Sequence, residues 1–347
     1  MNILIKKTCY ISLVLLISGF LTYGQKRSVL YSFKKQKNGI LLSADSKKLS
    51  VQFIDQAVVR VRFVPEGNFK DNGTDVCIPR KDIPVNFTVL QHNGLVTLQS
   101  ASLKLVISTT TGSIQYFNHA GKLLLTENSE APRITEKVTL NKNVFNDAAS
   151  KVEKTANGDQ VSANITSKET IGTAWKARQQ FIWQPGEALY GLGSHQEDYM
   201  NLRGTMQYLY EYNLKKSMPV LMSTKGYGML FDAGSAMIFH DDAVGSFIDM
   251  LAVNQVDYYF MYGPDFDQII HHFRSLTGKV ELPPKYMFGY IQSKEKYNNQ
   301  HEIDSVFNRF RSSHIPLDVI VQDWLYWTGN LWGYKKFDEK NTPILPK

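Results

Sequence analysis

Between Leu49 and Gly263 the chain alternates apolar and polar residues with a period of two. The clearest run is segment 58–64, in which Arg60 and Arg62 alternate with Val59, Val61 and Phe63. The same rhythm recurs, between Gly, Asn and Asp turns, in Phe87–Leu90, Leu95–Leu98, Leu103–Ile107, Ile114–Phe117, Gln179–Trp183, Val220–Ser223, Gly228–Phe231, Met237–His240 and Val256–Met261. Short alternating runs of this kind are typical of antiparallel sandwiches. We therefore predict a β-sandwich over residues 25–263, with the polar segment Asn143–Gly158 as an exposed loop.

At Pro264 the period changes from two residues to that of a helix. Asp265 is a suitable N-cap and Gly278 lies just beyond the expected end, where glycine commonly terminates helices. Between them, apolar residues recur at helical spacing: Phe266, Ile269, Ile270, Phe273 and Leu276. The prolines Pro283-Pro284 end this region. We predict a linker helix within residues 264–284.

Residues 285–347 read as strand, helix and strand. Tyr286–Ile291 is predicted as a buried strand, and Leu317–Val321, after Pro316, as a second one. Apart from Asp318, its residues are apolar, which is typical of a parallel sheet covered on both faces. The intervening helix is expected to bury Ile303, Val306, Phe307 and Phe310. A strand–helix–strand unit opens an α/β fold. The predicted fold class is therefore β plus α/β, with an N-terminal antiparallel sandwich followed by the first strands of an incomplete (β/α)8 barrel.

The N-terminus has the pattern of a secretory signal peptide. Lys6 and Lys7 precede the apolar run Tyr10–Leu21, and the small residues Thr22 and Gly24 lie three and one positions before a cleavage point at Gly24/Gln25. This run is shorter than the roughly 20 apolar residues that span a bilayer, so no stable membrane span is expected. We predict a signal peptide over residues 1–24 and a periplasmic or extracellular protein. Cleavage leaves Cys77 as the remaining cysteine, so we expect no intrachain disulfide.

The charge of the chain does not indicate nucleic-acid binding. Its formal net charge is +7 at pH 7, but the basic residues are scattered. A nucleic-acid site would gather them on one face. We expect no nucleic-acid partner.

The candidate chemistry lies directly after the second predicted barrel strand. Asp323 is followed by Trp324, Tyr326 and Trp327. Barrels bind ligands at the C-terminal ends of their strands. Carboxylates accept hydrogen bonds from sugar hydroxyls, and aromatic rings stack on sugar C–H faces, so Asp323 and Trp324 are predicted to bind a sugar. The alternative is that Asp323 caps a turn and the aromatic residues form a core. Tyr297, after the first strand, is a third candidate.

Other polar clusters do not have the spacing of a catalytic or metal site. Gly191–His195 lacks the rest of a dinucleotide or P-loop pattern, and we interpret it as a tight turn. His271-His272 is adjacent on a helix and does not converge on one metal ion. His301-Glu302 lacks a second histidine four residues on. Lys294 and Glu295 are interpreted as a solvated loop. We predict no metal site and no cofactor.

Several motifs together carry a family resemblance. They are Pro283-Pro284-Lys285-Tyr286 with Gly289–Lys294, Ile315–Trp324, Trp332-Gly333 with Phe337-Asp338, and upstream Ala188–Gly193 and Ser223–Gly228. In combination they resemble glycoside hydrolase family 31, from the mature N-terminus to Lys347, with a mutarotase-like sandwich before the barrel. The forms Gln292-Ser293-Lys294 and Gln322-Asp323-Trp324 are most similar to bacterial α-xylosidases.

The resemblance implies a retaining α-glycosidase, in which one carboxylate forms a glycosyl-enzyme and a second acts as acid and then base. It implies an α-linked oligosaccharide as substrate, with xyloglucan fragments as one source. Asp323 matches the position that binds hydroxyls of the sugar to be released. The loop Gln196–Met218 matches one that reaches into the active site, where many members carry an aspartate; none lies between Tyr199 and Met218 here.

The resemblance also places the nucleophile and the acid/base on later barrel strands. We therefore expect no catalytic residue in this chain and no hydrolysis by the 347-residue polypeptide alone. The alternative function is a non-catalytic carbohydrate-binding sandwich. Exposed aromatic residues spaced along one sheet face would favour that alternative.

Overall fold

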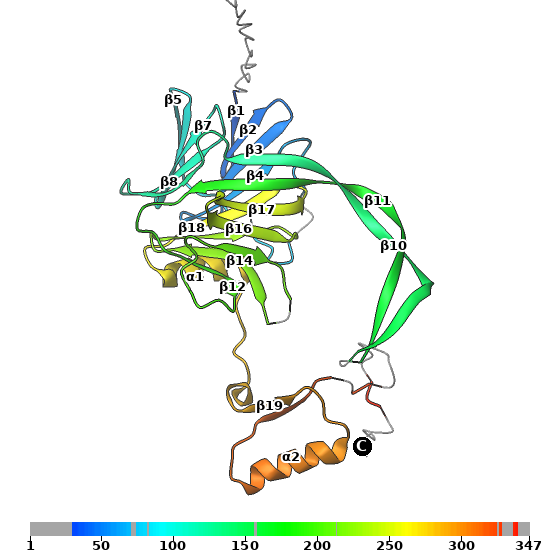
Figure 1. Ribbon diagram of the computed structural model, residues 1–347. Coiled ribbons are helices and arrows are strands. Elements are labelled where there is room, and N and C mark those ends of the chain that lie inside the picture. The colour runs from blue at the N-terminus through cyan, green and yellow to red at the C-terminus, as the bar shows by residue number, and fades with distance from the viewer. Residues whose placement is uncertain are drawn as a thin grey trace, which may run out of the picture.

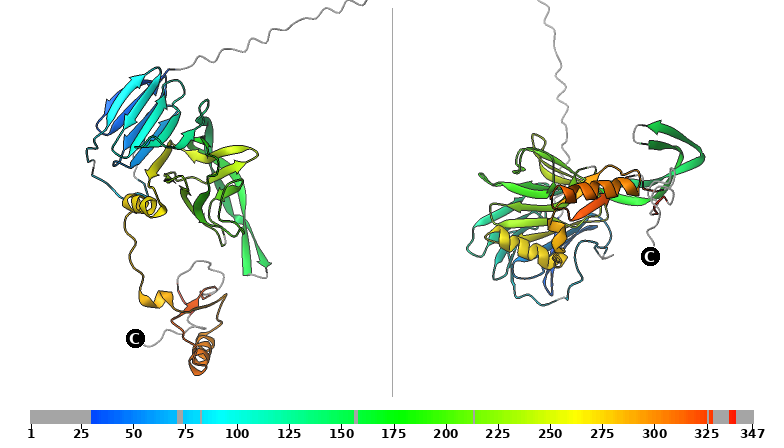
Figure 2. Two further views of the ribbon diagram at one scale, coloured as in Figure 1. Left: turned by 90° about the vertical axis from the view of Figure 1, so that its left-hand side faces the viewer. Right: turned by 90° about the horizontal axis from the view of Figure 1, so that it is seen from below.

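The computed structural model describes residues 30–70, 74–81, 83–155, 158–212, 214–324, 326–327 and 336–338. The predicted signal peptide, residues 1–24, lies outside these ranges. Two antiparallel sheets pack face to face, and a smaller strand–helix–strand unit follows them at the C-terminal end (Figures 1 and 2). The predicted order of sandwich, helix and parallel strand pair is confirmed.

The first sheet has eight strands within the described residues, in the order β1-β2-β3-β4-β18-β15-β14-β12. Their bounds are β1 Ser32–Gln36, β2 Gly39–Ala44, β3 Lys47–Phe53, β4 Val58–Val64, β12 Leu189–Ser194, β14 Lys216–Ser223, β15 Tyr227–Phe231 and β18 Val256–Tyr262. The sheet begins at Ser32, earlier than the alternation from Leu49 indicated. The final strand β18 pairs with β4, so residues nearly 200 positions apart are neighbours at its centre.

The second sheet follows the order β13-β16-β17-β11-β9-β8-β7-β6-β5, and β10 pairs with β11 beside it. The strands in this part of the described chain are β5 Thr88–His92, β6 Leu95–Gln99, β7 Leu103–Ser108, β8 Ile114–Asn118, β9 Leu123–Glu127, β10 Arg133–Thr155, β11 Gly158–Ile182, β13 Met206–Leu209, β16 Met237–Asp242 and β17 Gly245–Val253. Each alternating run identified in the sequence falls on one of these strands or on a strand of the first sheet.

The prediction of a loop at Asn143–Gly158 is wrong. Most of this segment belongs to the antiparallel pair β10–β11, which extends away from the sandwich as a long two-stranded ribbon (Figure 1). Its register shifts at three places, including Asn146/Lys151. A ribbon satisfies its backbone hydrogen bonds through its partner strand, whereas alternation is needed only where one face is buried. The polar sequence therefore gave no sign of a strand.

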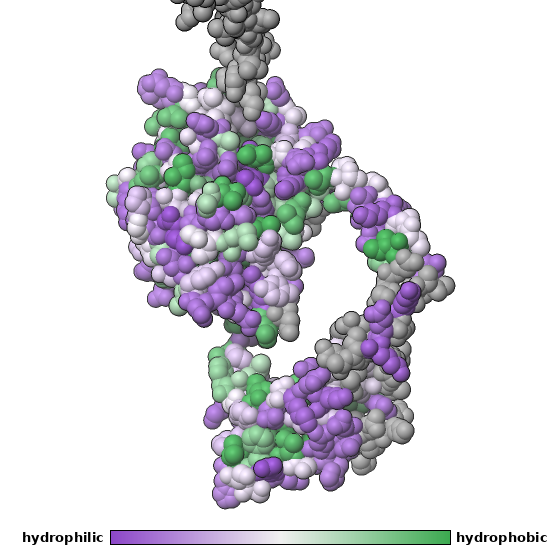
Figure 3. All heavy atoms as spheres, in the orientation of Figure 1, coloured by the Kyte–Doolittle hydropathy of each residue, from purple (hydrophilic) through white to green (hydrophobic). Residues whose placement is uncertain are grey.

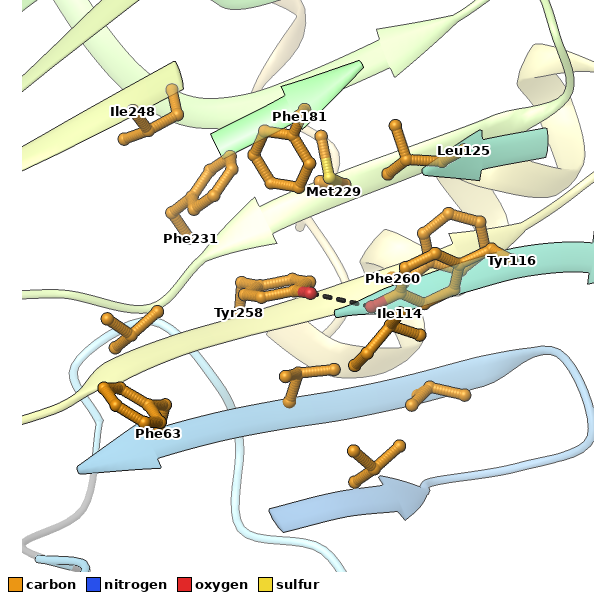
Figure 4. Close-up of a cluster of buried hydrophobic side chains, with 14 of the residues drawn as sticks. Phe63, Ile114, Tyr116, Leu125, Phe181, Met229, Phe231, Ile248, Tyr258 and Phe260 are labelled. Atoms are coloured by element: carbon orange, nitrogen blue, oxygen red, sulfur yellow. Dashed lines mark hydrogen bonds between the residues drawn. The ribbon is translucent and has the colours of Figure 1, made fainter. Parts of the chain in front are cut away.

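The core lies between the two sheets and is rich in aromatic residues (Figure 4). The ring of Tyr116 in β8 stacks on that of Phe260 in β18, with centroids 4.2 Å apart. Phe260 also stacks on Tyr227 of β15, with centroids 5.3 Å apart. The hydroxyl groups of Tyr116 and Tyr258 are hydrogen-bonded at 2.7 Å across the sandwich. Buried tyrosine hydroxyls need such partners.

The predicted linker helix is confirmed as α1, Phe266–Thr277. The Asp265 carboxylate accepts a hydrogen bond from the backbone N–H of Gln268 at 2.8 Å, which is the expected N-cap interaction, and Gly278 is the C-cap. Ile269 and Leu276 are fully buried. Leu276 joins a smaller apolar cluster on the outer face of the first sheet, so the helix covers that face rather than the core between the sheets.

The C-terminal unit contains β19 Ile291–Lys294, α2 Gln300–Ser312 and β20 Val319–Gln322, preceded by the 3-10 helix η1 Lys285–Phe288. The predicted buried strand at Tyr286–Ile291 is therefore wrong, because the chain turns through η1 and the strand begins only at Ile291. Both strands of the pair and the helix between them are confirmed. Neither α1 nor α2, nor any other described helix, is long and apolar enough to span a membrane.

The predicted apolar face of α2 is present but not buried. Phe307 is 40% exposed, and the described part of α2 has no fully buried residue. A two-stranded sheet is too narrow to cover a helix face. Apolar side chains also gather on the connection from the sandwich to this unit, where Leu282 is 88% and Phe288 72% exposed (Figure 3). Exposed apolar patches of this kind are typical of surfaces that contact other protein segments.

Candidate carbohydrate site

The candidate site is built on the parallel pair β19–β20. The strands pair in register from Ile291 with Val319 to Lys294 with Gln322. Both carboxyl ends therefore lie at one edge of the sheet, and Asp323 follows β20 at that edge. The Trp324 backbone N–H donates a 2.7 Å hydrogen bond to the Glu295 carbonyl, which keeps the two strand ends together beyond the ladder. Asp323 is exposed at this position and Trp324 is half-buried.

An ion pair connects the end of β19 to the start of α2. The Lys294 ammonium pairs with the Glu302 carboxylate in the first turn of α2. The Asn299 side chain caps α2 by accepting from the Glu302 N–H at 2.9 Å, and Glu302 accepts from the Asn298 N–H at 2.8 Å. Lys294 and the Asn298 N–H together lower the pKa of Glu302 to about 2. Lys294 is exposed, as predicted, but its assignment to a loop is wrong: it ends β19 and its ion pair joins that strand to α2.

Tyr297 lies beside the strand ends but is turned inward, with 3% of its surface exposed. Gln322 holds its backbone from both sides: the Tyr297 N–H donates to Gln322 Oε1 at 3.3 Å, and Gln322 Nε2 donates to the Tyr297 carbonyl at 3.0 Å. The Tyr297 hydroxyl accepts from Gln292 Nε2 at 3.3 Å. Tyr297 thus connects the ends of β19 and β20 by contacts made inside the unit. Its predicted role in substrate binding stays a prediction.

The aromatic residues after Asp323 form a contiguous cluster. Trp324 and Trp327 meet edge to face with centroids 5.3 Å apart, and Tyr326 contacts Trp327 at 5.2 Å. The rings of Phe337 and Tyr326 lie with centroids 5.3 Å apart. The Asp338 N–H holds the two segments together by donating to the Tyr326 carbonyl at 2.7 Å. Trp327 is 7% exposed, so it anchors the cluster. The motif Trp332-Gly333 lies outside the described residues.

These contacts give the strand edge both chemical features of a sugar site. The exposed Asp323 carboxylate is an acceptor for hydroxyl groups, and the half-buried Trp324 ring beside it is an apolar surface fixed by its aromatic neighbours. Asp323 and Trp324 adjoin each other in the chain at this edge, and their role in sugar binding stays a prediction, whereas Tyr297 supports the edge from within. Gln322, whose amide joins the two strand ends, was not predicted as a site residue. A polar residue closing an apolar strand was the available signal.

The loop Gln196–Met218 is more ordered than a simple loop. It contains strand β13, which pairs with β16 from Met206 opposite His240 to Leu209 opposite Met237. It starts from β12, where the predicted tight turn at Gly191–His195 is instead a bulged strand with a register shift between Gly191 and Gly193. Leu192 has φ of 61°, and a Cβ at Gly193 would lie 1.9 Å from the Lys216 carbonyl. Glycine is required there because β14 approaches so closely.

A buried carboxylate anchors this loop to the second sheet. Asp241 Oδ2 accepts from Arg203 Nε at 2.6 Å and from the Gly204 N–H at 2.9 Å, and Oδ1 accepts from the Ser246 hydroxyl at 2.6 Å. Arg203 also donates to the carbonyls of Gln184 and Glu187, at 3.3 and 3.2 Å. Burial opposes ionisation of Asp241, but the hydrogen bonds from Ser246, Gly204 and Arg203 outweigh it and lower its pKa.

We expect the anchor at Asp241 to make the protein less stable in acid. A carboxyl whose pKa is lower in the folded state stabilises the fold above its unfolded pKa of about 3.9 and loses that contribution as the pH falls through the folded value. Urea unfolding of the wild type should therefore show a falling free energy of unfolding below about pH 4. In Asp241→Asn that slope should be smaller, and the stability at neutral pH lower. Asp304→Asn, on the exposed surface of α2, is the control. Equal slopes in all three proteins would contradict the role of Asp241.

Comparison with known families supports the two-part organisation. Residues 48–239, more than half of the chain, match the model of the glycosyl hydrolase 31 N-terminal galactose mutarotase-like domain. Residues 280–347 match that of the glycosyl hydrolases family 31 TIM-barrel domain. The first match covers strands of both sheets, and the second covers the complete β19–α2–β20 unit and Asp323.

Individual relatives agree with these matches. An α-xylosidase of Saccharolobus solfataricus is 38% identical over 195 residues, covering 52% of this chain and 26% of the relative. An α-glucosidase 2 of Bacillus thermoamyloliquefaciens is 23% identical over 320 residues, covering 91% of this chain and 37% of the relative. The chain thus spans between a quarter and two fifths of the length of these two relatives.

Solved structures show the same fold. The family 31 α-xylosidase of Xanthomonas citri superposes with a TM-score of 0.72 at 18% identity, over 90% of this chain and 47% of that one. A Flavobacterium johnsoniae family 31 dextranase in complex with glucose gives a TM-score of 0.70 at 23% identity, over 91% and 36%. With the family models matching both parts in sequence order, the chain belongs to glycoside hydrolase family 31, of which it carries the N-terminal mutarotase-like sandwich and the first strands of the TIM barrel.

Proposed function

We propose that this protein acts as a retaining α-glycosidase and that this chain supplies part of its sugar-binding site. The observation that carries the proposal is the exposed Asp323 carboxylate at the carboxyl end of β20, next to Trp324. The parallel register of β19 and β20 aligns this edge as a barrel rim, where barrel enzymes bind their substrates. Asp323 would accept hydrogen bonds from hydroxyl groups of the sugar that is released, and Trp324 would pack against that sugar.

In a retaining glycosidase the anomeric carbon is substituted twice, first by the enzyme and then by water. A carboxylate nucleophile attacks the anomeric carbon while a carboxylic acid protonates the leaving oxygen; water, activated by the same residue as base, then releases the sugar with its original configuration. The two carboxyl groups stand about 5–5.5 Å apart in such enzymes. We propose that Asp323 is neither of them but holds the sugar in place for both steps. Residues 1–347 alone are accordingly proposed to bind sugar without cleaving it.

The substrate we propose is an α-linked xyloside, with oligosaccharides from xyloglucan as the source. Support comes from the 38% identity to the Saccharolobus α-xylosidase over 195 residues. The motifs Gln292-Ser293-Lys294 and Gln322-Asp323-Trp324, which resemble those of bacterial α-xylosidases, occupy the ends of β19 and β20. An α-glucoside is the other candidate. We also propose that the protein is exported, on the basis of the signal-peptide pattern in residues 1–24.

Hydrolysis of p-nitrophenyl α-xyloside and p-nitrophenyl α-glucoside tests this function. The protein expressed from the whole of its reading frame should cleave the xyloside faster, and proton NMR should show the α-anomer of the free sugar before mutarotation. Initial release of the β-anomer would exclude a retaining mechanism. The purified 347-residue chain should cleave neither substrate. Turnover by that chain would show that a catalytic carboxylate lies within it.

A further inference from the structure

The ribbon β10–β11 extends from the sandwich without a third strand beside it. Near its base, β11 pairs with β17 from Trp175 to Gln180 and with β9 at its last two residues. Beyond this base, within the part of the chain that the structure describes, the two strands of the ribbon pair with each other alone. The free stretch of β10, residues 138–155, has a contour length of roughly 60 Å at about 3.3 Å per residue.

A free two-stranded ribbon of this length is unfavourable in water. Isolated hairpins are marginally stable at best, and independent stability needs further strands or a packed face. This ribbon also exposes large apolar side chains: Val144 37%, Phe145 51%, Ile165 48% and Ile171 62%. Phe145 and Ile165 are register partners, so their side chains lie next to each other on one face. Such a surface is typical of a segment that contacts another part of a protein.

The ribbon curves toward the C-terminal unit. It leaves the sandwich beside β17 and descends toward β19 and α2 in Figure 1, and the left view of Figure 2 agrees. Figure 3 shows an open space bounded by the sandwich, the ribbon and the C-terminal unit. The C-terminal unit also leaves apolar side chains uncovered, including Met287, Phe288 and Phe307. Uncovered apolar side chains thus occur on two of the three structures that border this space.

A family 31 barrel is a partner of suitable size and position for the ribbon. Residues 280–347 match the barrel domain, and their described part holds two parallel strands, β19 and β20. A (β/α)8 barrel has eight strands inside a ring of helices and typically about 250 residues. A compact body of that size has a radius of gyration of roughly 18 Å and is about 45 Å across. Because the further barrel units must adjoin β19 and β20, a ribbon of roughly 60 Å is long enough to lie along their outer helices.

We propose that the distal part of the ribbon, residues 138–155 and 158–174, is a strap that packs on the outer helices of the remaining barrel units of the same polypeptide. Phe145 and Ile165 provide an apolar contact with those helices. Since the base of the ribbon is fixed to β17, the strap joins barrel and sandwich at a second place, apart from the linker helix α1. A second copy of the chain is a less suitable partner, because the ribbon curves toward its own C-terminal unit. The proposal rests on the family assignment and not on the proposed glycosidase activity.

Hydrogen–deuterium exchange of backbone amides tests the proposal by comparing the 347-residue chain with the protein expressed from the whole of its reading frame. We expect the amides of the strap to exchange at least about tenfold more slowly in the longer protein, because a covered strap opens less often. Amides of β7, inside the second sheet, should exchange equally in both proteins. Equal exchange of the strap in the two proteins, whether fast or slow, overturns the proposal. A reading frame that encodes no further barrel units also overturns it.

The double variant Phe145→Asp with Ile165→Asp tests the contact itself. It should restore fast exchange of the strap in the longer protein, and it should leave the Tm of the 347-residue chain unchanged because both side chains are exposed there. Leu90→Asp, a similar change on the exposed edge strand β5, is the matched control and should leave exchange of the strap unchanged.

Two further results would contradict the proposed contact. Slow exchange that persists in the double variant overturns the assignment of Phe145 and Ile165 as contact residues. Protection of the strap that appears only as the protein concentration rises, together with a dimer in light scattering, places the strap against a second copy and overturns the proposal. Hydrolysis assays do not enter this comparison, so failure of the proposed activity leaves it intact.

Discussion

Replacing Arg133 with methionine is expected to lower the free energy of unfolding by about 3–5 kcal/mol, because it leaves the Glu127 carboxylate buried without its counter-charge. Glu127 is 0% exposed, and Arg133 Nη2 lies 2.5 Å from its Oε1. The same carboxylate accepts hydrogen bonds from Gln179, Tyr258 and the Ile114 N–H. Burial raises the pKa of Glu127, and Arg133 is the main group that opposes this shift. Without Arg133 the carboxyl must bind a proton or the structure must admit water.

Urea unfolding at neutral pH measures this loss of stability. Two further variants test whether it arises from the buried charge of Glu127. The double variant Arg133→Met with Glu127→Gln should recover part of the loss, because the neutral amide can keep hydrogen bonds to its neighbours without a charge to compensate. Lys137→Met, also on β10, removes an ion pair with Glu66 in which both side chains are more than half exposed. That pair is expected to contribute at most about 1 kcal/mol. If Arg133→Met costs no more than Lys137→Met, the buried pair is not a determinant of stability.

The sandwich could be predicted from the sequence because one face of most strands is buried. In β7, Leu103, Leu105 and Ile107 are 0% exposed and the residues between them face outward, so the alternation records burial directly. The ribbon β10–β11 is solvated on both faces over much of its length and has no such alternation to read. Its strands depend on backbone pairing with each other, which leaves no periodic signal.

The start of the barrel shows a different limit. Tyr286, Met287 and Phe288 look like a buried strand in sequence, but they form a 3-10 turn and are more than half exposed. An apolar run indicates that a segment prefers contact with other apolar groups, whereas its backbone conformation depends on the strands beside it. Within the described residues β19 has one partner strand, so pairing fixes only Ile291–Lys294.

The candidate site was predictable only where its residues are close together in the sequence. Asp323 and Trp324 adjoin an apolar strand, so their place at a strand end follows from the sequence. The contacts that hold this edge do not. Gln322 reaches Tyr297 across 25 positions, and Arg203 reaches Asp241 across 38. Such pairs become neighbours only after the strands are arranged. The centre of the first sheet is a further example, because β4 and β18 meet there from opposite ends of the sandwich sequence.

In the protein expressed from the whole reading frame, Asp323→Asn is expected to lower kcat/KM on p-nitrophenyl α-xyloside by about a hundredfold or more. Hydrogen bonds to the sugar hydroxyls strengthen as the ring approaches the oxocarbenium-like transition state, and together they supply several kcal/mol. The loss should therefore appear in kcat as well as in KM, since a residue that bound substrate and transition state equally would change KM alone. The fold should be unaffected, because Asp323 is exposed.

Asp304→Asn is the matched control for this substitution, and thermal unfolding of both variants should coincide with that of the wild type. The alternative role of Asp323, as a cap of the turn after β20, leads to the opposite pattern. A capping residue would lower Tm when replaced, since a lost cap costs roughly 1 kcal/mol, and would leave the chemical step nearly unchanged. A large fall in kcat at constant Tm therefore requires that Asp323 contact the sugar, whereas a lower Tm with unchanged kcat would assign it to the turn.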